Sequence, residues 1–204
     1  MNDTTREARA LWRAANDLGD VQRLMVGYIR GEQPANPWYA GPLEEESDPL
    51  AFHLEEIVRA GFITIGSQPG IRTRGLRKQR AFIDGFARTG SDVLDAIVEP
   101  MRALGYSVIA EQGDPDQMSP YDVPVTLDAF GRPFTHLAST AVIPATLEMD
   151  DTWVNRALLH ELTETVTPVQ IIDPQWGRNA LFTDLQRLLV ANAMRGAVWA
   201  EDPS

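Results

Sequence analysis

The residues best suited to chemistry lie in one stretch of the chain, PWYAGPLEEESDPLAFHLEEIVRAGFITIGSQPG, which runs from Pro37 to Gly70. It carries a carboxylate at Glu46 and hydroxyls at Ser47, Thr64 and Ser67. These residues fall at the ends of predicted elements, where polar groups can face a ligand instead of the core. They are therefore the first candidates for ligand contact.

The same stretch predicts the elements that position them. Asp48 is placed to cap a helix with Pro49 at its first position, where a missing N–H costs nothing. A glycine at Gly61 ends this helix, and Phe62 to Ile65 is predicted to be a short buried strand. The apolar stripe of the helix consists of Leu50, His53, Leu54, Ile57 and Val58.

A basic segment, GIRTRGLRKQR, follows directly after this strand. It contains no acidic residue, and its cations are Arg72, Arg74, Arg77, Lys78 and Arg80. Two interpretations remain open: a solvated loop that balances an acidic surface, or a contact with a phosphate or nucleotide.

Composition limits the class of protein. The chain has 204 residues, 44% of them hydrophobic, which is enough for one domain with a substantial core or for two small ones. We expect a single domain spanning residues 1–204. It has no cysteine, which excludes disulfides, thiolate metal sites and thiol nucleophiles. A net charge of −11 argues against broad binding to nucleic acid. No signal segment or membrane-spanning run is visible, so we expect a cytoplasmic protein without membrane contact.

The rest of the chain alternates between helices and strands. This pattern predicts an α/β or α+β fold, with a mixed β-sheet core flanked by helices. Asp20 and Asp92 are expected to cap helices, and Pro100 is expected to kink or end the second of them. Further helices are predicted from about Thr152 to Glu164 and from Asn179. Strands are predicted at Arg80–Ala87, Tyr106–Ala110, Val123–Leu127, Phe134–Ile143 and Val169–Ile172.

Other candidate catalytic residues have simpler interpretations. His160-Glu161 resembles the start of a zinc-protease helix, but Glu164 stands where the second histidine belongs, so an ordinary amphipathic helix and no metal site are expected. His53 on an apolar stripe is expected to be a hydrogen-bonded structural residue. The run Glu44 to Glu46 is also consistent with a solvated acidic helix start. Glycine-rich phosphate loops and the GxSxG motif are absent from the sequence.

The chain from about Leu11 to Val190 resembles the C-terminal regulatory domain of eukaryotic methylenetetrahydrofolate reductase. PWYAGPLEEES is similar to the family's Pro-Trp-x-x-x-Pro-Leu-x-x-Glu-Thr segment, and GFITIGSQPG to its Gly-x-Leu-Thr-Ile-Asn-Ser-Gln-Pro strand. LWRAANDLGDVQRLMVGYIRGE, KQRAFIDGF and PVQIIDPQWGRNALFTDLQRLL resemble further family segments in the same order. The resemblance implies a domain that binds S-adenosylmethionine or S-adenosylhomocysteine.

Position by position, the resemblance implies a set of ligand-binding residues. The family's glutamate and hydroxyl pair falls on Glu46 and Ser47, and its strand threonine and serine fall on Thr64 and Ser67. Two later threonines align, with gaps, to Thr126 and Thr140. The ligand offers ribose hydroxyls, an adenine edge, an ammonium and a carboxylate, so one anion and several small polar groups suit it.

Some positions depart from the family pattern. The family's strand asparagine is Gly66 here, another of its asparagines is Val58, and its long glycine-rich insert is shortened into the basic segment. We expect a standalone ligand-binding protein that acts as a sensor or sequestering module, with a protein partner or homo-oligomer left open. One alternative is an enzyme that consumes S-adenosylmethionine as a lyase or hydrolase, with Glu46 as base. The other is a nucleotide-binding protein that uses the basic loop from Arg72 to Arg80, with Arg72, Arg74 and Arg77 as phosphate contacts.

Overall fold

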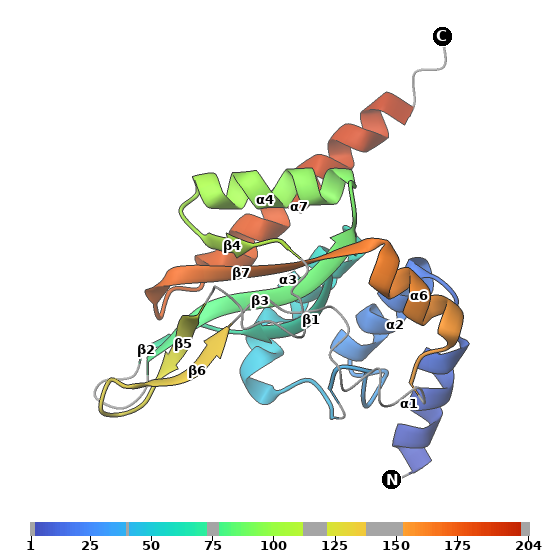
Figure 1. Cartoon of the computed structure of the whole chain (residues 1–204), viewed down its shortest axis with the longest axis horizontal. Coiled ribbons are helices and arrows are strands. Elements are labelled where there is room, and N and C mark those ends of the chain that lie inside the picture. The colour runs from blue at the N-terminus through green and yellow to red at the C-terminus, as the bar shows by residue number, and fades with distance from the viewer. Residues whose placement is uncertain (1–2, 40, 73–77, 112–121, 138–152, 201–204) are drawn as a thin grey trace.

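The computed structural model describes residues 3–39, 41–72, 78–111, 122–137 and 153–200, with side chains from residue 6 to residue 195. Figure 1 shows a sheet with helices around it. The helices are α1 (Asp3–Ala14), α2 (Leu18–Ile29), the 3-10 helix η1 (Glu45–Leu50), α3 (Ala51–Arg59), α4 (Asp92–Ala103), α6 (Arg156–Glu164) and α7 (Ala180–Ala200). The strands are β1 (Ile63–Gln68), β2 (Ile71–Arg72), β3 (Lys78–Arg88), β4 (Ser107–Ile109), β5 (Val123–Leu127), β6 (Pro133–Leu137) and β7 (Val166–Trp176). This is the mixed α/β fold that the sequence predicts.

The long strand β3 organises the sheet. In the described part of the chain the strand order is β4-β7-β3-β5-β6, and β1 and β2 also pair with β3. All of these pairings are antiparallel. Opposite β1, the register places Gly66 beside Asp84 and Ser67 beside Ile83, after an irregularity between Thr64 and Gly66.

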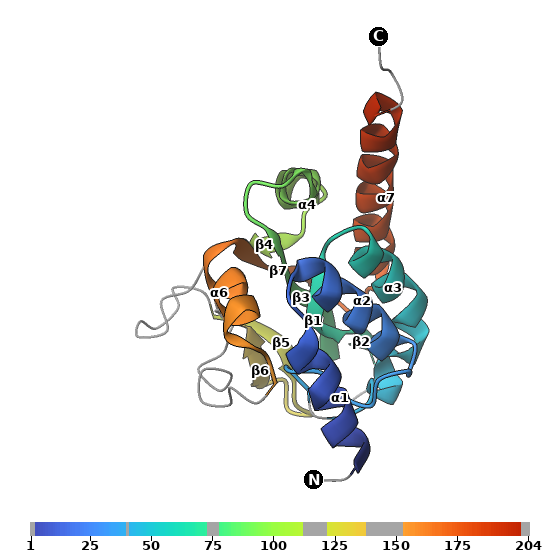
Figure 2. The ribbon, with the colours of Figure 1, turned by 90° about the vertical axis from the view of Figure 1, so that its right-hand side faces the viewer.

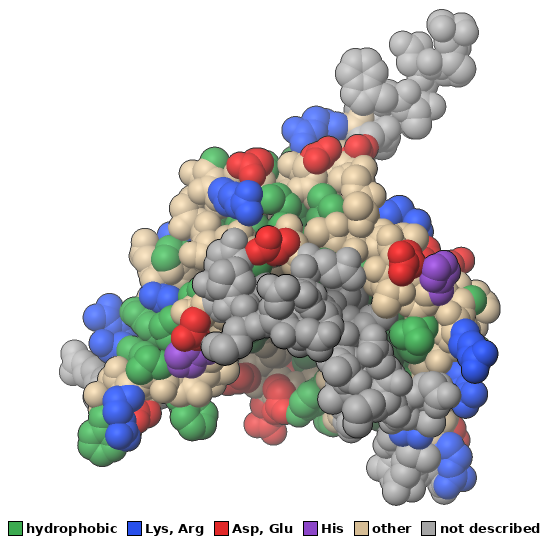
Figure 3. Space-filling view, viewed as in Figure 1, with side chains coloured by type: hydrophobic (Ala, Val, Ile, Leu, Met, Phe, Trp, Pro, Cys, Tyr) green, Lys and Arg blue, Asp and Glu red, His purple; other side chains and the backbone are tan. Residues whose placement is uncertain are grey.

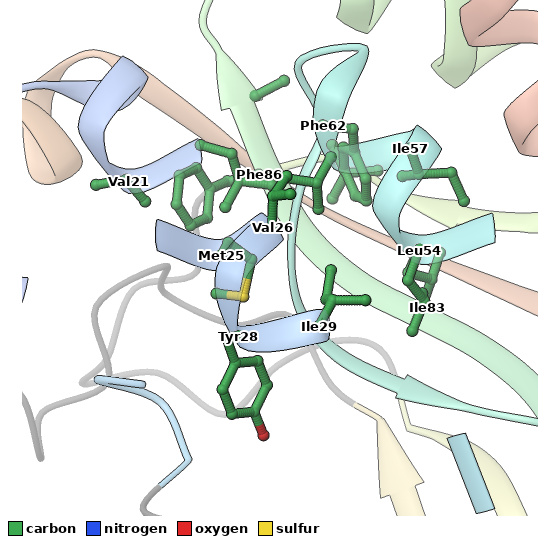
Figure 4. Packing of buried hydrophobic residues seen from close by; sticks show 14 of the residues in the cluster. Val21, Met25, Val26, Tyr28, Ile29, Leu54, Ile57, Phe62, Ile83 and Phe86 are labelled. Atoms are coloured by element: carbon green, nitrogen blue, oxygen red, sulfur yellow. The ribbon is translucent and has the colours of Figure 1, made fainter. Parts of the chain in front are cut away.

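The helices form a connected layer against this sheet. α2 contacts α3, α3 contacts α7, and α7 contacts α4; Figure 2 shows these helices from the side. Their apolar faces bury a core with fully covered aromatic rings at Trp12, Phe62, Phe86 and Phe182. Figure 4 shows α2 side chains meeting those of α3, β3 and Phe62, which directly precedes β1, with the Tyr28 hydroxyl directed away from the cluster.

Several element boundaries differ from the sequence prediction. The turn from Glu45 to Leu50 is a 3-10 helix that contains Pro49, and α3 begins only at Ala51, so Asp48 does not cap it. Asp17, not Asp20, caps α2 by accepting from the Asp20 N–H at 2.9 Å. The second error is local, because neighbouring aspartates can supply the same capping oxygen, whereas α3 continues from a 3-10 turn and has no side-chain cap.

Further differences concern α4 and the later elements. The position before α4 is Ser91, not Asp92, and Pro100 lies inside a helix that continues to Ala103. α6 begins later than expected, and α7 begins just after Asn179, whose side chain bonds the Gly70 backbone instead. β7 is longer than predicted, and the described part of the strand predicted from Phe134 ends at residue 137.

The surface carries charges of both signs over the face shown in Figure 3. The exposed rings of Phe130 and Phe134 lie at the β5–β6 hairpin. None of the described helices is long and apolar enough to cross a membrane.

Candidate functional site

A cavity of about 250 Å³ lies where α2, η1 and β1 meet. Its volume is slightly below the range of about 300–1,000 Å³ typical of small-molecule sites. Most of its wall is apolar, with a few polar groups among aromatic and aliphatic side chains. The lining residues are Met25, Tyr28, Ile29, Asn36, Trp38, Tyr39, Leu43, Glu44, Ser47, Leu54, Thr64, Ile65, Gly66, Ser67 and Phe82.

Residues 35–39 and 41–44, here called the strap, form one side of this cavity. Asn36 is buried, and its side-chain oxygen accepts from the Trp38 N–H at 2.8 Å and the Tyr39 N–H at 2.9 Å. This Asx-type turn directs Trp38 into the molecule. The Trp38 ring packs between Trp12 and Phe86, at centroid distances of 6.0 Å and 5.7 Å. Aromatic packing therefore fixes the strap against α1 and β3.

Three of the predicted site residues meet in this cavity. Ser47 comes from η1, and Thr64 and Ser67 come from β1. Ser47 and Thr64 are buried, at 3% and 6% exposure, while Ser67 is half-buried. Buried hydroxyls that face a cavity can donate to or accept from a polar ligand. The 3-10 turn produces this arrangement, because the Ser47 N–H bonds to the Glu44 carbonyl at 2.8 Å.

The carboxylate that lines the cavity is Glu44, two residues before the predicted Glu46. The Tyr39 hydroxyl donates a hydrogen bond to the Glu44 carboxylate, and this bond raises the pKa of Tyr39. Burial is the largest cause that raises the pKa of Tyr28 to about 12, and the nearby Tyr39 and Glu44 raise it further. Both phenols are therefore protonated near pH 7, and the Tyr39 hydroxyl hydrogen is already engaged by Glu44.

The other predicted site residues lie elsewhere. Glu46 is exposed and is not among the residues that line the cavity. Thr126 is buried in β5, where it pairs with Gln79 of β3 and Thr135 of β6. Thr140 lies outside the described residues. Their role in binding stays a prediction.

The basic segment is only partly described. Arg72 is exposed in β2 and packs close to Gly177, but it does not line the cavity. Arg74 and Arg77 lie outside the described residues. Arg80 donates to the Pro124 carbonyl and stacks over Trp176 at 4.4 Å, so in this structure it has a structural role.

Two histidine predictions can be compared with their surroundings. His53 is half-buried, and its Nδ1 lies 2.6 Å from the Gln186 Oε1, which links α3 to α7 and confirms the structural interpretation. His160 is exposed on α6. Within the described ranges, no three histidine or acidic side chains are grouped as metal ligands would be.

Sequence reasoning missed the aromatic and amide part of the cavity. Asn36, Trp38, Tyr39 and Tyr28 all line it, and the first three belong to or adjoin the Pro-Trp motif. That motif was the available signal. Its meaning depends on Trp12 and Phe86, which are distant in sequence.

Comparison with known proteins places the chain in a family. A family model described as a domain of unknown function, DUF6919, matches residues 7–192. The chain belongs to this family. The DUF6919 match covers the cavity, the strap and the whole described sheet.

The DUF6919 chain is also similar in part to two curated yeast proteins. It is 36% identical to methylenetetrahydrofolate reductase 2 of Saccharomyces cerevisiae over 76 residues, which is 36% of this chain and 13% of that protein. It is 23% identical to methylenetetrahydrofolate reductase 1 of Schizosaccharomyces pombe over 133 residues, which is 58% of this chain and 22% of that protein. The chain thus spans less than a quarter of the length of these relatives.

Proposed function

We propose that the protein binds S-adenosylmethionine or S-adenosylhomocysteine in the cavity at the strap. The observation that carries the proposal is the meeting of Ser47, Thr64 and Ser67 in that cavity. The partial similarity to methylenetetrahydrofolate reductases supports it, because the resemblance implies this ligand class.

The chemistry of the wall suits such a ligand. Trp38 and Phe82 offer flat apolar surfaces for an adenine ring, and the three hydroxyls can bond ribose or amino-acid groups. Glu44 can accept from hydroxyls or an ammonium at the mouth. Because the cavity is slightly below the usual size range, we expect part of the ligand to remain outside it.

Isothermal titration tests the proposal, with S-adenosylmethionine and S-adenosylhomocysteine as ligands and ATP and adenosine as controls. We expect heat with one or both sulfur compounds. Absence of binding by either compound at high protein concentration contradicts the proposal. Preferential binding of ATP, lost at high salt, favours the nucleotide alternative instead.

Two matched variants identify the carboxylate that acts in binding. Glu44→Gln should weaken binding by about 1–3 kcal/mol, because Glu44 lines the cavity. Glu46→Gln is its control and should have a smaller effect, because Glu46, which is exposed like Glu44, lies outside the lining. A larger loss in Glu46→Gln would instead support the position that the resemblance implies.

We propose a binder and not an enzyme, because the described residues of the lining include no histidine or lysine to activate a hydroxyl. Mass spectrometry after long incubation separates the two. Intact ligand is expected. Release of adenine, methylthioadenosine or a lactone, lost in Glu44→Gln or Glu46→Gln, contradicts the binder proposal.

A further inference from the structure

A second carboxyl group, Asp84, lies directly behind the cavity wall. Asp84 stands in the middle of β3, where the register places it beside Gly66 of β1. Gly66 and Phe82 both line the cavity, and Phe82 is two residues from Asp84 on the same strand. Side chains two residues apart in a strand point to the same face, so Asp84 shares the face of Phe82.

The absence of a side chain at Gly66 leaves room between Asp84 and the cavity. A Cβ atom built at Gly66 would lie 3.6 Å from the Asp84 Cβ and 4.0 Å from its Oδ2, and 3.9 Å from the Phe82 ring. These are ordinary van der Waals distances, so the fold itself does not require a glycine here. The glycine therefore leaves the Oδ2 side of Asp84 facing the cavity wall.

Among the described residues, no cationic side chain acts on Asp84. Its Oδ1 is wholly covered and has no hydrogen-bond partner in the described part of the protein. Burial raises the pKa of Asp84 to about 7, opposed by hydrogen bonds from the Gln170 side chain and the Gly85 backbone. A buried carboxylate without a cation is costly, and a cation placed beside it would recover part of that cost.

The neighbouring elements confirm this imbalance of charge. β1 has no ionisable side chain, and neither does the part of β7 opposite Asp84, from Val166 to Ile172. On β3 itself, Arg80 is engaged with Pro124 and Trp176. The ionisable groups that line the cavity, Tyr28, Tyr39 and Glu44, are neutral or negative. The described residues therefore supply no positive partner for Asp84, and a cationic group of a ligand can take that place.

We propose that Asp84 is the anionic anchor for a positively charged group of the ligand, an ammonium or a sulfonium, reached through the gap at Gly66. This inference rests on the proposed function for the choice of ligand, but it extends to any small organic cation. It makes the cavity selective for charge as well as shape, because a neutral group placed there gains no attraction from the ionised form of Asp84.

Proton linkage gives the inference a measurable consequence. A cation favours the ionised carboxylate, so binding lowers the pKa of Asp84 and displaces its proton. With a free pKa of about 7 and a bound pKa about one unit lower, the affinity for a cationic ligand rises about threefold between pH 6 and pH 7. Asp84→Asn removes this dependence.

The decisive experiment follows the Asp84 carboxyl carbon by carbon-13 NMR as pH is varied. The Asp84 signal is assigned by its loss in Asp84→Asn. Titrations are run without ligand and with S-adenosylmethionine, S-adenosylhomocysteine, trimethylsulfonium, methylammonium and the neutral dimethyl sulfide. We expect the cations, and not dimethyl sulfide, to lower the titration midpoint by about one unit, equivalent to a tenfold coupling. A shift with S-adenosylhomocysteine indicates contact with the ammonium, and a shift with S-adenosylmethionine or trimethylsulfonium alone indicates the sulfonium.

Two substitutions act on the proposed contact in different ways. Gly66→Ala adds a methyl group between Asp84 and the cavity, so it should reduce the shift while the ligand-free midpoint stays near 7. Asp95→Asn, on the exposed face of α4, is the control and should leave the shift unchanged.

The outcomes separate this inference from the proposed function. If both sulfur compounds bind but no cation moves the Asp84 midpoint, the anchor is wrong and the binding proposal stands. If neither sulfur compound binds but small cations still lower the midpoint, the anchor stands with a different ligand. A midpoint that none of the probes changes overturns the inference in either case.

Discussion

At the scale of single residues, Thr64 and Ser67 carry the most direct test of the cavity. Thr64→Val and Ser67→Ala remove hydroxyls that line it. Each should weaken binding of the sulfur ligand by about 1–3 kcal/mol, the cost of losing a polar partner in a buried site. Isothermal titration measures the change, and Thr89→Val, at an exposed hydroxyl pair with Thr167, is the matched control. Equal affinities in all three variants would place the ligand elsewhere.

Asp84 also makes a residue-scale prediction about stability. Its pKa is about 7 in the folded protein against an ordinary value of 3.8. Between these values the folded state holds a proton that the unfolded state has lost, so Asp84 makes the free energy of unfolding fall as pH rises from about 4 to about 7. Above pH 7 both states are ionised and the contribution is constant.

Asp84→Asn removes that dependence and keeps the shape of the side chain. The variant should therefore become more stable than the unmodified protein as pH rises through this window, at up to about 1.4 kcal/mol per pH unit. Urea unfolding of both proteins at pH 5, 6, 7 and 8 measures the difference. A difference that does not change with pH means that Asp84 is not held neutral by burial.

At the scale of elements, Asn155 joins the start of α6 to the end of α1. Its side-chain oxygen accepts from the Ala157 and Leu158 N–H groups, both at 3.0 Å. Its amide donates to the Arg13 carbonyl at 3.1 Å and the Ala15 carbonyl at 2.6 Å. One side chain therefore caps a helix and holds two segments 140 residues apart in sequence.

Two substitutions separate these roles. Asn155→Ala should lower the free energy of unfolding by about 1–3 kcal/mol, because it loses both the cap and the link. Asn155→Ser keeps a capping oxygen but cannot supply the amide donors, so it should recover only part of the loss. Urea unfolding measures both, and full recovery by serine contradicts the link to α1.

At the scale of the whole molecule, ligand binding is coupled to folding. A ligand that binds only the folded protein at 100 times its dissociation constant adds about 2.7 kcal/mol to the free energy of unfolding. We therefore expect the melting temperature to rise with the concentration of S-adenosylhomocysteine. Asn155→Ala should melt lower but keep the same increment, because Asn155 is not among the cavity-lining residues. A melting temperature that does not respond to ligand contradicts binding to the folded state.

The helices and many strand positions could be predicted from the sequence because their signals are local. Gly31 and Gly61 adopt positive φ angles of 76° and 98° just after α2 and α3, where glycine is expected after a helix. β5 has the predicted bounds, Val123–Leu127. Each of these features depends on residues a few positions apart.

Within the candidate site, the sequence indicated Ser47, Thr64 and Ser67 but only the tertiary structure brings them together. A strand has a side-chain period of two, which fixes the faces of the strand but not its partner or register. The pairing of β1 with β3 places Gly66 beside Asp84, and packing on Trp12 and Phe86 turns Trp38 into the cavity wall. The central place of β3, the choice of Glu44 over Glu46 as lining residue, and the burial of Asp84 are likewise decided by contacts between distant segments, which no local pattern encodes.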